Sequence, residues 1–574
     1  MVSGEVMIGI ICQETQRPFV KEFFELFKTP WEFFTASGTY DVVVISAPTP
    51  VVPDARLVVV FGACQYSWDV DRVIGMPAGR GGIPVDHQGQ RFPVYGIAAR
   101  LERPSAPLAT LAGRPGVVSA EYQDGTRRVI RVGYDLFEEV RFLLSEGQPA
   151  EHAATPTLDI HIDLLRGWIL GTGLPLVEIP PLPRAYDFAV CLTHDVDFIN
   201  LRDHMKDRSL FGFIGRALLP RNLRNAHSRL AWSRLWKNWK AVLSLPAVYL
   251  RLCRDTWFDF DRYAKIERGL DPTYFFLPRK GHAGDPAPET APLLRAARYR
   301  VEEHADLISG LKRSGAEIAM HGIDAWHSAQ RGGAERRIIG SVAEQEPAGV
   351  RMHWLYFSSS SPRHLEEAGF SYDSTLGFNE AVGFRSGTTQ VFRLPGTARL
   401  LELPLNIMDS ALFYPGRMGL SERDALRSCA GLIETVRKHG GVLTINWHTR
   451  SLNPERNWDG FYMELLGALK AHRVWFANAG TVVDWFRGRR AIRFEAVSGA
   501  SDRVKVTCAA TGGGGRLPKG YTLRVHRPGT GSSHTFTDVP LSGGETARTI
   551  VTSVAGVARL NDGLQFRDAV WHTA

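Results

Sequence analysis

Short apolar runs alternate with helical patterns from Tyr186 to about residue 488, and this rhythm narrows the possible folds more than any other feature of the chain. The runs have the length of buried strands, and the segments between them carry apolar residues at helical spacing. Strands joined by helices form a parallel sheet, which predicts an α/β barrel of about seven strands. The predicted strands lie at 188–193, 273–277, 316–320, 349–353, 370–373, 400–406 and 441–447, and the predicted helices at 288–314, 331–346, 361–368 and 421–439.

Two segments of different character flank the barrel region. Residues 1–180 favour a small α/β domain of unknown role, with strands at 8–11, 42–45 and 57–61 and helices at 19–27 and 135–144. Residues 491–574 alternate polar and apolar side chains between Gly-rich turns at 512–515 and 543–544, which is typical of a small antiparallel β-sandwich. We therefore predict three domains, with the barrel at 181–490 in the middle.

The composition is that of a soluble globular protein, because 44% of the 574 residues are hydrophobic and 22% are charged. The six cysteines include no C-x-x-C pair, which argues against a disulfide framework or a zinc ribbon. The N-terminal residues 1–14 lack a basic region before their apolar run and are interpreted as a first strand instead of a signal peptide. No run reaches the roughly 18 apolar residues of a membrane span. These features predict a cytoplasmic protein.

A basic segment at residues 208–254 contains ten Arg or Lys and no Asp or Glu. Its net positive charge exceeds the net charge of +8 of the whole chain. Its apolar residues Trp232, Leu235, Trp236, Trp239, Val242 and Leu243 have the spacing of one helix face. Peripheral contact with an anionic membrane or an acidic glycan is one interpretation. The interpretation we favour is a helical insertion at about 200–265 that packs its Trp face on the barrel. Nucleic-acid binding is not expected, since no recognition motif accompanies the charge.

Ionisable side chains follow five of the predicted strands. The first strand leads into Thr193, His194, Asp195 and Asp197, and the later ones lead into His321, Asp324 and His327, into Arg351 and His353, into Asp373, and into His448. The carboxyl ends of parallel strands meet at one edge of the sheet, where catalytic groups collect. A carboxylate with two imidazoles is a common ligand set for Zn²⁺, and a second carboxylate and a further His can serve as general base and acid. The sequence therefore predicts a metal-dependent hydrolytic site.

In the order of these motifs, residues 186–488 resemble the polysaccharide deacetylase family, also called the NodB-homology or carbohydrate esterase 4 group. The resemblance is greatest to bacterial members with a T-H-D-V-D first motif and an N-terminal extension. It implies a distorted (β/α)7 barrel that removes N-acetyl groups from a saccharide or glycan. It also implies one divalent metal ion, Zn²⁺ in the first place, with Co²⁺, Ni²⁺ or Fe²⁺ as alternatives.

The resemblance assigns roles to particular residues. Asp195 resembles the catalytic base, Arg351 the arginine that orients it, His448 the general acid and Asp373 the acid that tunes that histidine. Asp197 and His321 match metal ligands. The second motif departs from the family's H-[ST]-x-x-H, because position 325 is Ala325, and we assign the third ligand to His327, with Asp324, His353 or water as alternatives.

Six residues near the strand ends are candidates for substrate contact, namely His194, Asp324, His353, Arg385, Asp409 and Trp447. Two other functions stay open at this stage. One is a glycan-binding or scaffolding protein that kept the barrel and lost the chemistry through the altered second motif. The other is hydrolysis of a non-sugar amide at the same site.

Overall fold

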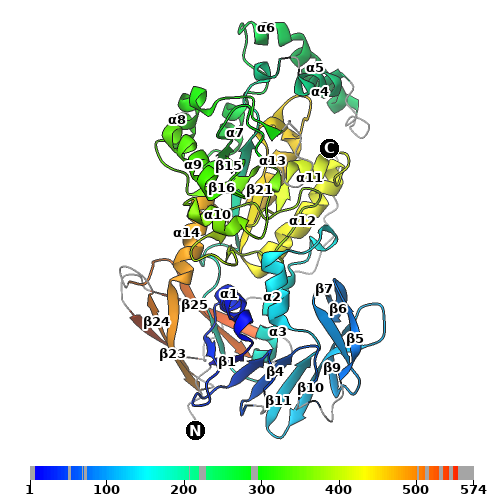
Figure 1. Cartoon of the computed structure of the whole chain (residues 1–574), viewed down its shortest axis with the longest axis vertical. Coiled ribbons are helices and arrows are strands. Elements are labelled where there is room, and N and C mark those ends of the chain that lie inside the picture. Colours follow the sequence, from blue (N-terminus) through cyan, green and yellow to red (C-terminus); the bar gives the residue numbers. More distant parts are fainter. Residues whose placement is uncertain are drawn as a thin grey trace.

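The computed structural model describes residues 7–49, 53–66, 69, 74–205, 207–218, 228–285, 295–500, 503–510, 516–528, 534–541 and 547–553 (Figure 1). The predicted Gly-rich turns at 512–515 and 543–544 and the side chain of Trp232 lie outside the described residues. The protein is a mixed α/β structure with two large sheets and two small ones.

The region from 188 to 476 forms one sheet around the first predicted strand, β13 (Phe188–Val196). All its pairings are parallel except that of β18 with β19, as expected for strands joined by helices. The strands run in the order β18 (Phe392–Arg393), β19 (Leu401–Glu402), β17 (Tyr372–Asp373), β16 (Gly349–Met352), β15 (Glu317–Gly322), β14 (Thr273–Phe276), β13, β21 (Val442–Asn446) and β20 (Ile407–Met408), while β22 (Val474–Phe476) also pairs with β13. Among the described strands no pairing joins β18 to β20, so this path stays open.

Helices follow these strands largely where the sequence predicts them. They are α8 (Ala305–Arg313), α9 (Ala329–Ala343), α10 (Ser361–Glu367), α12 (Glu422–His439), α13 (Asp459–Lys470) and α14 (Ala479–Arg490). Ser328, Ser421 and Asn478 cap α9, α12 and α14 through their side-chain oxygens. In place of the helix predicted at 288–314, the described residues form a 3-10 turn at Val301–His304 followed by the shorter helix α8.

The N-terminal segment contains an eleven-stranded mixed sheet. The predicted strands β1 (Ile8–Ile11), β3 (Val42–Ile45) and β4 (Leu57–Phe61) and helices α1 (Arg17–Phe27) and α2 (Leu136–Ser145) are confirmed. The sequence did not reveal β2 (Trp31–Phe33), β5 (Ile74–Arg80), β6 (Ile83–His87), β7 (Gln90–Val94), β8 (Ile97–Leu101), β9 (Ala106–Leu111), β10 (Val117–Asp124) and β11 (Arg127–Val132). Helix α3 (Thr157–Leu170) follows.

Two three-stranded sheets share the C-terminal core. One consists of β23 (Ile492–Ala500), β24 (Arg503–Ala510) and β27 (Ala547–Ser553), the other of β12 (Leu176–Glu178), β25 (Thr522–Pro528) and β26 (His534–Pro540). Strand β12 comes from the segment before residue 180, and its Val177 is buried among apolar residues of β23 to β25. The last strand of the N-terminal segment therefore completes the C-terminal sheets.

The helical insertion consists of α4 (Arg208–Leu218), α5 (Ser228–Leu243) and α6 (Leu245–Tyr249), followed by α7 (Phe260–Ile266). Helices α4 to α6 stand at the end of the molecule opposite the N-terminal sheet (Figure 1). The prediction that the Trp face of α5 packs on the barrel is wrong for Trp236, Trp239 and Leu243, which are exposed. The reason is that the opposite face of α5 packs inward, where Asn238 and Ala241 are buried. No described helix has both the length and the apolar character needed to cross a membrane.

Candidate metal centre

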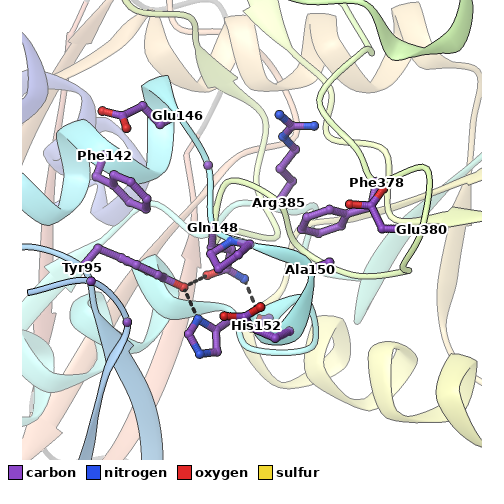
Figure 2. Close-up of a pocket in the computed structure, with 14 residues that line it drawn as sticks. Tyr95, Phe142, Glu146, Gln148, Ala150, His152, Phe378, Glu380 and Arg385 are labelled. Carbon is purple, nitrogen blue, oxygen red and sulfur yellow. Dashed lines mark hydrogen bonds between the residues drawn. The ribbon is translucent and has the colours of Figure 1, made fainter. Parts of the chain in front are cut away.

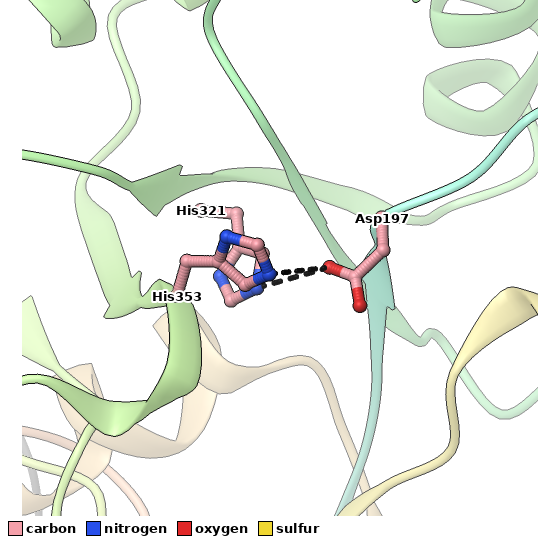
Figure 3. Close-up of side chains that lie close together, drawn as sticks. All are labelled: Asp197, His321 and His353. Carbon is pink, nitrogen blue, oxygen red and sulfur yellow. Dashed lines mark ion pairs between the residues drawn. The ribbon is translucent and has the colours of Figure 1, made fainter. Parts of the chain in front are cut away.

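Asp197, His321 and His353 converge at the carboxyl ends of three strands of one sheet (Figure 3). Asp197 follows β13 directly, His321 is in β15, and His353 is the first residue after β16. The Oδ1 atom of Asp197 lies 3.4 Å from His321 Nε2 and 3.5 Å from His353 Nε2. Two ligand atoms that are each about 2.1 Å from a tetrahedral ion lie roughly 3.4 Å apart, so the spacing suits one Zn²⁺-sized ion.

The protonation states of Asp197 and His353 also suit a metal. Asp197 Oδ1 is buried and has no hydrogen-bond partner among the described residues. Burial by itself would raise the pKa of Asp197, but His353, His321 and His448 hold it well below its usual range. Burial lowers the pKa of His353 to about 3. Metal ligands must be ionised carboxylates and neutral imidazoles, and Asp197 and His353 meet these conditions.

A hydrogen bond fixes the orientation of the His321 ring. Its Nδ1 lies 2.9 Å from the carbonyl oxygen of Arg351 and donates to it, which leaves the Nε2 lone pair facing Asp197. A hydrogen bond from the ring nitrogen that does not face the metal is the usual way in which proteins select the tautomer of a metal-binding histidine.

The structure does not bring His327 to this centre. Its Nε2 lies 3.4 Å from Asp324 Oδ1, in a separate cluster where Asp324 also accepts from His282 at 2.8 Å. The chain makes a turn after β15, in which the His327 amide donates to the Asp324 carbonyl, and α9 begins two residues later. This turn carries His327 away from the strand ends, and His353, instead of His327, lies beside Asp197 and His321.

Asp195 lies beside these three side chains and is held as a carboxylate. Arg351 Nη1 donates to one of its oxygens at 2.9 Å and Asn446 Nδ2 to the other at 2.6 Å. Burial would raise the pKa of Asp195, but His321 and Arg351 outweigh it and lower the pKa. Arg351 is itself fixed by Ser374, whose carbonyl accepts from its Nε at 2.9 Å. The sequence analysis missed Asn446, a polar residue at the buried end of β21.

His448 faces the centre from the other side. Its Nε2 lies 3.8 Å from Asp197 Oδ2, and its Nδ1 lies 2.6 Å from Asp409 Oδ1. Asp409 is fully buried and also accepts from the His448 backbone amide at 2.7 Å. The structure thus places Asp409, and not Asp373, next to the His448 ring.

Asp373 lies instead against Glu402, and both carboxyls are fully buried. Burial raises the pKa of Asp373 to about 7. Burial also raises the pKa of Glu402 well above its usual range, and the charge of the neighbouring Asp373 raises it further. Such a pair stabilises the fold below the unfolded pKa values near 4, and the contribution is lost as pH rises through about 7.

This pair gives a prediction for stability. Glu402→Gln removes one titrating group, so the melting temperature of the variant should fall less between pH 5 and pH 8 than that of the wild type, by about 2–4 °C. Scanning calorimetry at the two pH values measures the difference. Glu367→Gln, on the exposed surface of α10, is the control. An equal fall in wild type and Glu402→Gln would contradict the shared titration.

The other predicted substrate residues do not reach the centre. His194 is buried with its Nδ1 2.7 Å from the Trp447 carbonyl and its Nε2 3.1 Å from Glu267. Trp447 is also buried, stacked on Tyr462. Arg385 faces a different cavity. These residues support the strand ends and do not line the site.

The cavity at the candidate metal centre has a volume of about 290 Å³. It is lined by Asp197, His321 and His353, by Asp195 and His448, and by an arginine-rich wall that the sequence analysis did not identify: Arg295, Arg298, Arg417, Arg450 and Arg456. Arg450 pairs with Glu455 at 2.9 Å, whereas Arg417 donates only to the neutral Ser410 hydroxyl at 2.7 Å among the described contacts. The wall therefore retains positive charge toward the cavity.

A second, larger cavity of about 650 Å³ lies between the N-terminal segment and the barrel region (Figure 2). Tyr95 stacks on Phe142 at 4.6 Å on one side, and Phe378 and Glu380 form part of the other. Their neighbour Asn379 lines the cavity at the candidate metal centre. One loop therefore borders both cavities.

Comparisons with known proteins give structural neighbours only. No family model and no curated protein matches the chain. A putative polysaccharide deacetylase from Mycobacterium smegmatis is 20% identical over 54% of this chain and 93% of its own, with a TM-score of 0.34. The carbohydrate deacetylase Agd3 is 9% identical over 97% of this chain and 99% of its own, with a TM-score of 0.40. A family 4 acetyl xylan esterase from Clostridium thermocellum, in complex with a cobalt ion, is 12% identical over 52% and 90%, with a TM-score of 0.24.

Most of the structural neighbours are thus polysaccharide deacetylases and related esterases. An allantoinase is also among them, 16% identical over 54% of this chain and 93% of its own, with a TM-score of 0.34. At these identities and TM-scores, any functional assignment depends on the side chains of the centre itself.

Proposed function

We propose that the chain is a metal-dependent hydrolase that removes N-acetyl groups from a saccharide or glycan, built on a distorted (β/α)7 barrel at 181–490. The observation that carries the proposal is the convergence of Asp197, His321 and His353 beside a carboxylate, Asp195, and an imidazole, His448. Domains at 1–180 and 491–574 flank the barrel in this proposal, with β12 assigned to the C-terminal one.

The chain's own groups account for the proton transfers. Asp195, ionised between Arg351 and Asn446, accepts a proton from the attacking water. The water oxygen bonds to the acetyl carbon, the C–N bond breaks, and His448 donates a proton to the departing nitrogen. The products are acetate and a free amino sugar. A divalent ion held by Asp197, His321 and His353 would act as a Lewis acid that polarises the acetyl carbonyl.

The alternative of a catalytically impaired glycan-binding protein depends on the missing histidine at position 325. His353 supplies an imidazole 3.5 Å from Asp197, which removes the main support for this alternative. Hydrolysis of a non-sugar amide uses the same groups. We favour a glycan because the second cavity, with its Tyr95 and Phe142 rings, offers further room for a polymer along the shared loop.

Metal content and acetate release test the proposal together. The purified chain is loaded with Zn²⁺, Co²⁺ or Ni²⁺, and acetate is followed with N-acetylglucosamine oligomers and with a simple N-acetylated amine. We expect about one metal ion per chain and acetate release from the oligomers only. A chain that binds none of the three ions and releases no acetate would return the assignment to a binding protein. Release from the simple amine alone would favour the non-sugar hydrolase.

The His448–Asp409 pair predicts the pH dependence. Burial lowers the pKa of His448, but Asp409, Asp197 and Asp195 outweigh it and raise the pKa to about 9. The proton-donating form is present below this pH and is lost as pH rises through it. Asp409→Asn should move the basic limb of the kcat profile down by about one pH unit or more. Asp484→Asn, an exposed site on α14, is the control, and an unmoved limb would exclude His448 as the acid.

A further inference from the structure

The helical insertion exposes an unusual share of large apolar side chains. Thirteen large hydrophobic residues are exposed in the described part of the chain, and eight of them lie between residues 205 and 252. These eight are Met205, Phe211, Leu218, Trp236, Trp239, Leu243, Leu250 and Leu252. Single exposed apolar residues are ordinary, whereas a concentration of them marks a surface that another body covers.

The exposed apolar stripe of helix α5 is not the face by which this helix packs on the rest of the chain. Trp236, Trp239 and Leu243 recur at helical spacing and form one stripe, and Trp236 and Leu243 are 65% and 76% exposed. The opposite stripe is buried, with Asn238 at 0% and Ala241 at 4%. The helix is thus anchored by one face and presents a second apolar face outward.

Positive charge surrounds the exposed stripe. No acidic residue occurs between 208 and 254, where there are ten Arg or Lys. Lys237 and Lys240 lie at the edge of the stripe, are exposed, and form no ion pair with another described residue. Arg234 and Arg254 pair with Glu422 and Asp261 outside the segment. The surface therefore combines bulky apolar side chains with the uncompensated cations of Lys237 and Lys240.

The insertion projects from one end of the molecule, next to the catalytic cavity. Helices α4 to α6 stand clear of the strands of the barrel region (Figure 1). Ser209 at the start of α4 lines the cavity, as do His204 and Asp207 just before the helix. A body bound to the insertion would therefore lie beside the mouth of the cavity.

We propose that the insertion binds the surface of an anionic phospholipid membrane. Trp and Leu side chains enter the boundary between headgroups and acyl chains, while Lys and Arg contact the phosphates. A second copy of the chain fits less well, because a symmetric contact would bring two basic surfaces together. An acidic polysaccharide would satisfy the cations but would leave Leu243, Leu250 and Leu252 in water.

One consequence rests on the proposed function. An insertion seated on a membrane holds the catalytic cavity at the same surface, so the N-acetylated glycan that it accepts would be one that is attached to, or lies against, a membrane.

Flotation with lipid vesicles tests the membrane contact without relying on activity. The full chain is mixed with phosphatidylcholine vesicles that contain either no anionic lipid or about 30% phosphatidylglycerol, at about 0.1 M and 1 M salt. We expect flotation with the anionic vesicles at low salt only. Trp236→Ser/Leu243→Ser and Lys237→Glu/Lys240→Glu should each reduce the bound fraction at least about tenfold. The controls Ile97→Ser and Arg516→Glu/Lys519→Glu, exposed sites elsewhere, should bind like the wild type.

Other outcomes overturn the proposal. A membrane contact through this surface is excluded if the wild type does not float. It is also excluded if both insertion variants float as well as the wild type. Binding to soluble heparin that survives Trp236→Ser/Leu243→Ser, without flotation, indicates an acidic glycan. A dimer in sedimentation velocity that the same variant abolishes, without flotation, indicates a second copy. Acetate release from soluble oligomers is measured on every variant and should not change, so failure of the membrane proposal and failure of the proposed hydrolase are seen separately.

Discussion

Asp195→Asn is expected to reduce acetate release by roughly 10²–10⁴-fold while leaving the metal content near that of the wild type. Asparagine has almost the same shape as aspartate and can still accept from Arg351 and Asn446, but it cannot take a proton from water. The metal should remain because Asp195 is not one of the three ligands. The loss should appear in kcat, since the proton transfer belongs to the transition state.

The measurement is steady-state kinetics with metal-loaded protein, together with circular dichroism and metal analysis of the same sample. Asp484→Asn makes the same chemical change at an exposed position and should retain full activity. Asp195→Asn protein that keeps its metal and works within tenfold of the wild type would remove Asp195 from the role of base. Loss of metal in this variant would show that Asp195 is a ligand.

The sequence predicts most of the barrel strands because they are buried on both faces and form continuous apolar runs. The strands β5 to β11 escape notice for the opposite reason. They pair mostly antiparallel and place exposed residues among buried ones, as in β9, where Ala106 and Pro107 are exposed and Leu111 is buried. Such short half-buried runs are difficult to tell from loops without their partners.

The strand ends could be predicted as a site, but the partner of each side chain could not. Asp409 is an example. The pairing of β20 with β21 sets Met408 opposite Asn446, which brings the next residue, Asp409, level with the residues just before His448. That register joins segments about 40 residues apart, and no local pattern records it. The family resemblance therefore assigns Asp373 as the partner of His448, although the neighbour of Asp373 is Glu402.

His353 shows the same limit at the metal centre. In β15 and β16 the register sets His321 opposite Arg351, so the ring two residues after Arg351 reaches the same edge as His321. The H-x-x-x-H spacing of the second motif directs attention to the turn after His321, where only His327 is found. The second imidazole beside Asp197 is instead that of His353, which follows the neighbouring strand β16.

His353→Ala is expected to lower the bound metal from about one ion per chain to less than about one tenth, while His327→Ala retains it. Loss of a residue that only orients a ligand costs about 10–100-fold in metal affinity, and loss of a ligand should exceed this. Zn²⁺ titration against a competing chelator measures the affinity of both variants, which remove the same side chain from positions 26 residues apart.

The two histidines differ in a way that makes the comparison decisive. His353 Nδ1 has no hydrogen-bond partner among the described residues, so its removal leaves no broken hydrogen bond there. His327 lies 3.4 Å from Asp324, whose carboxylate keeps His282 and the Asp285 amide as partners when His327 is removed. Both variants should therefore fold, as circular dichroism would show. If His327→Ala lost the metal and His353→Ala kept it, the ligand set would be Asp197, His321 and His327, and the turn after β15 would have to rearrange around the ion.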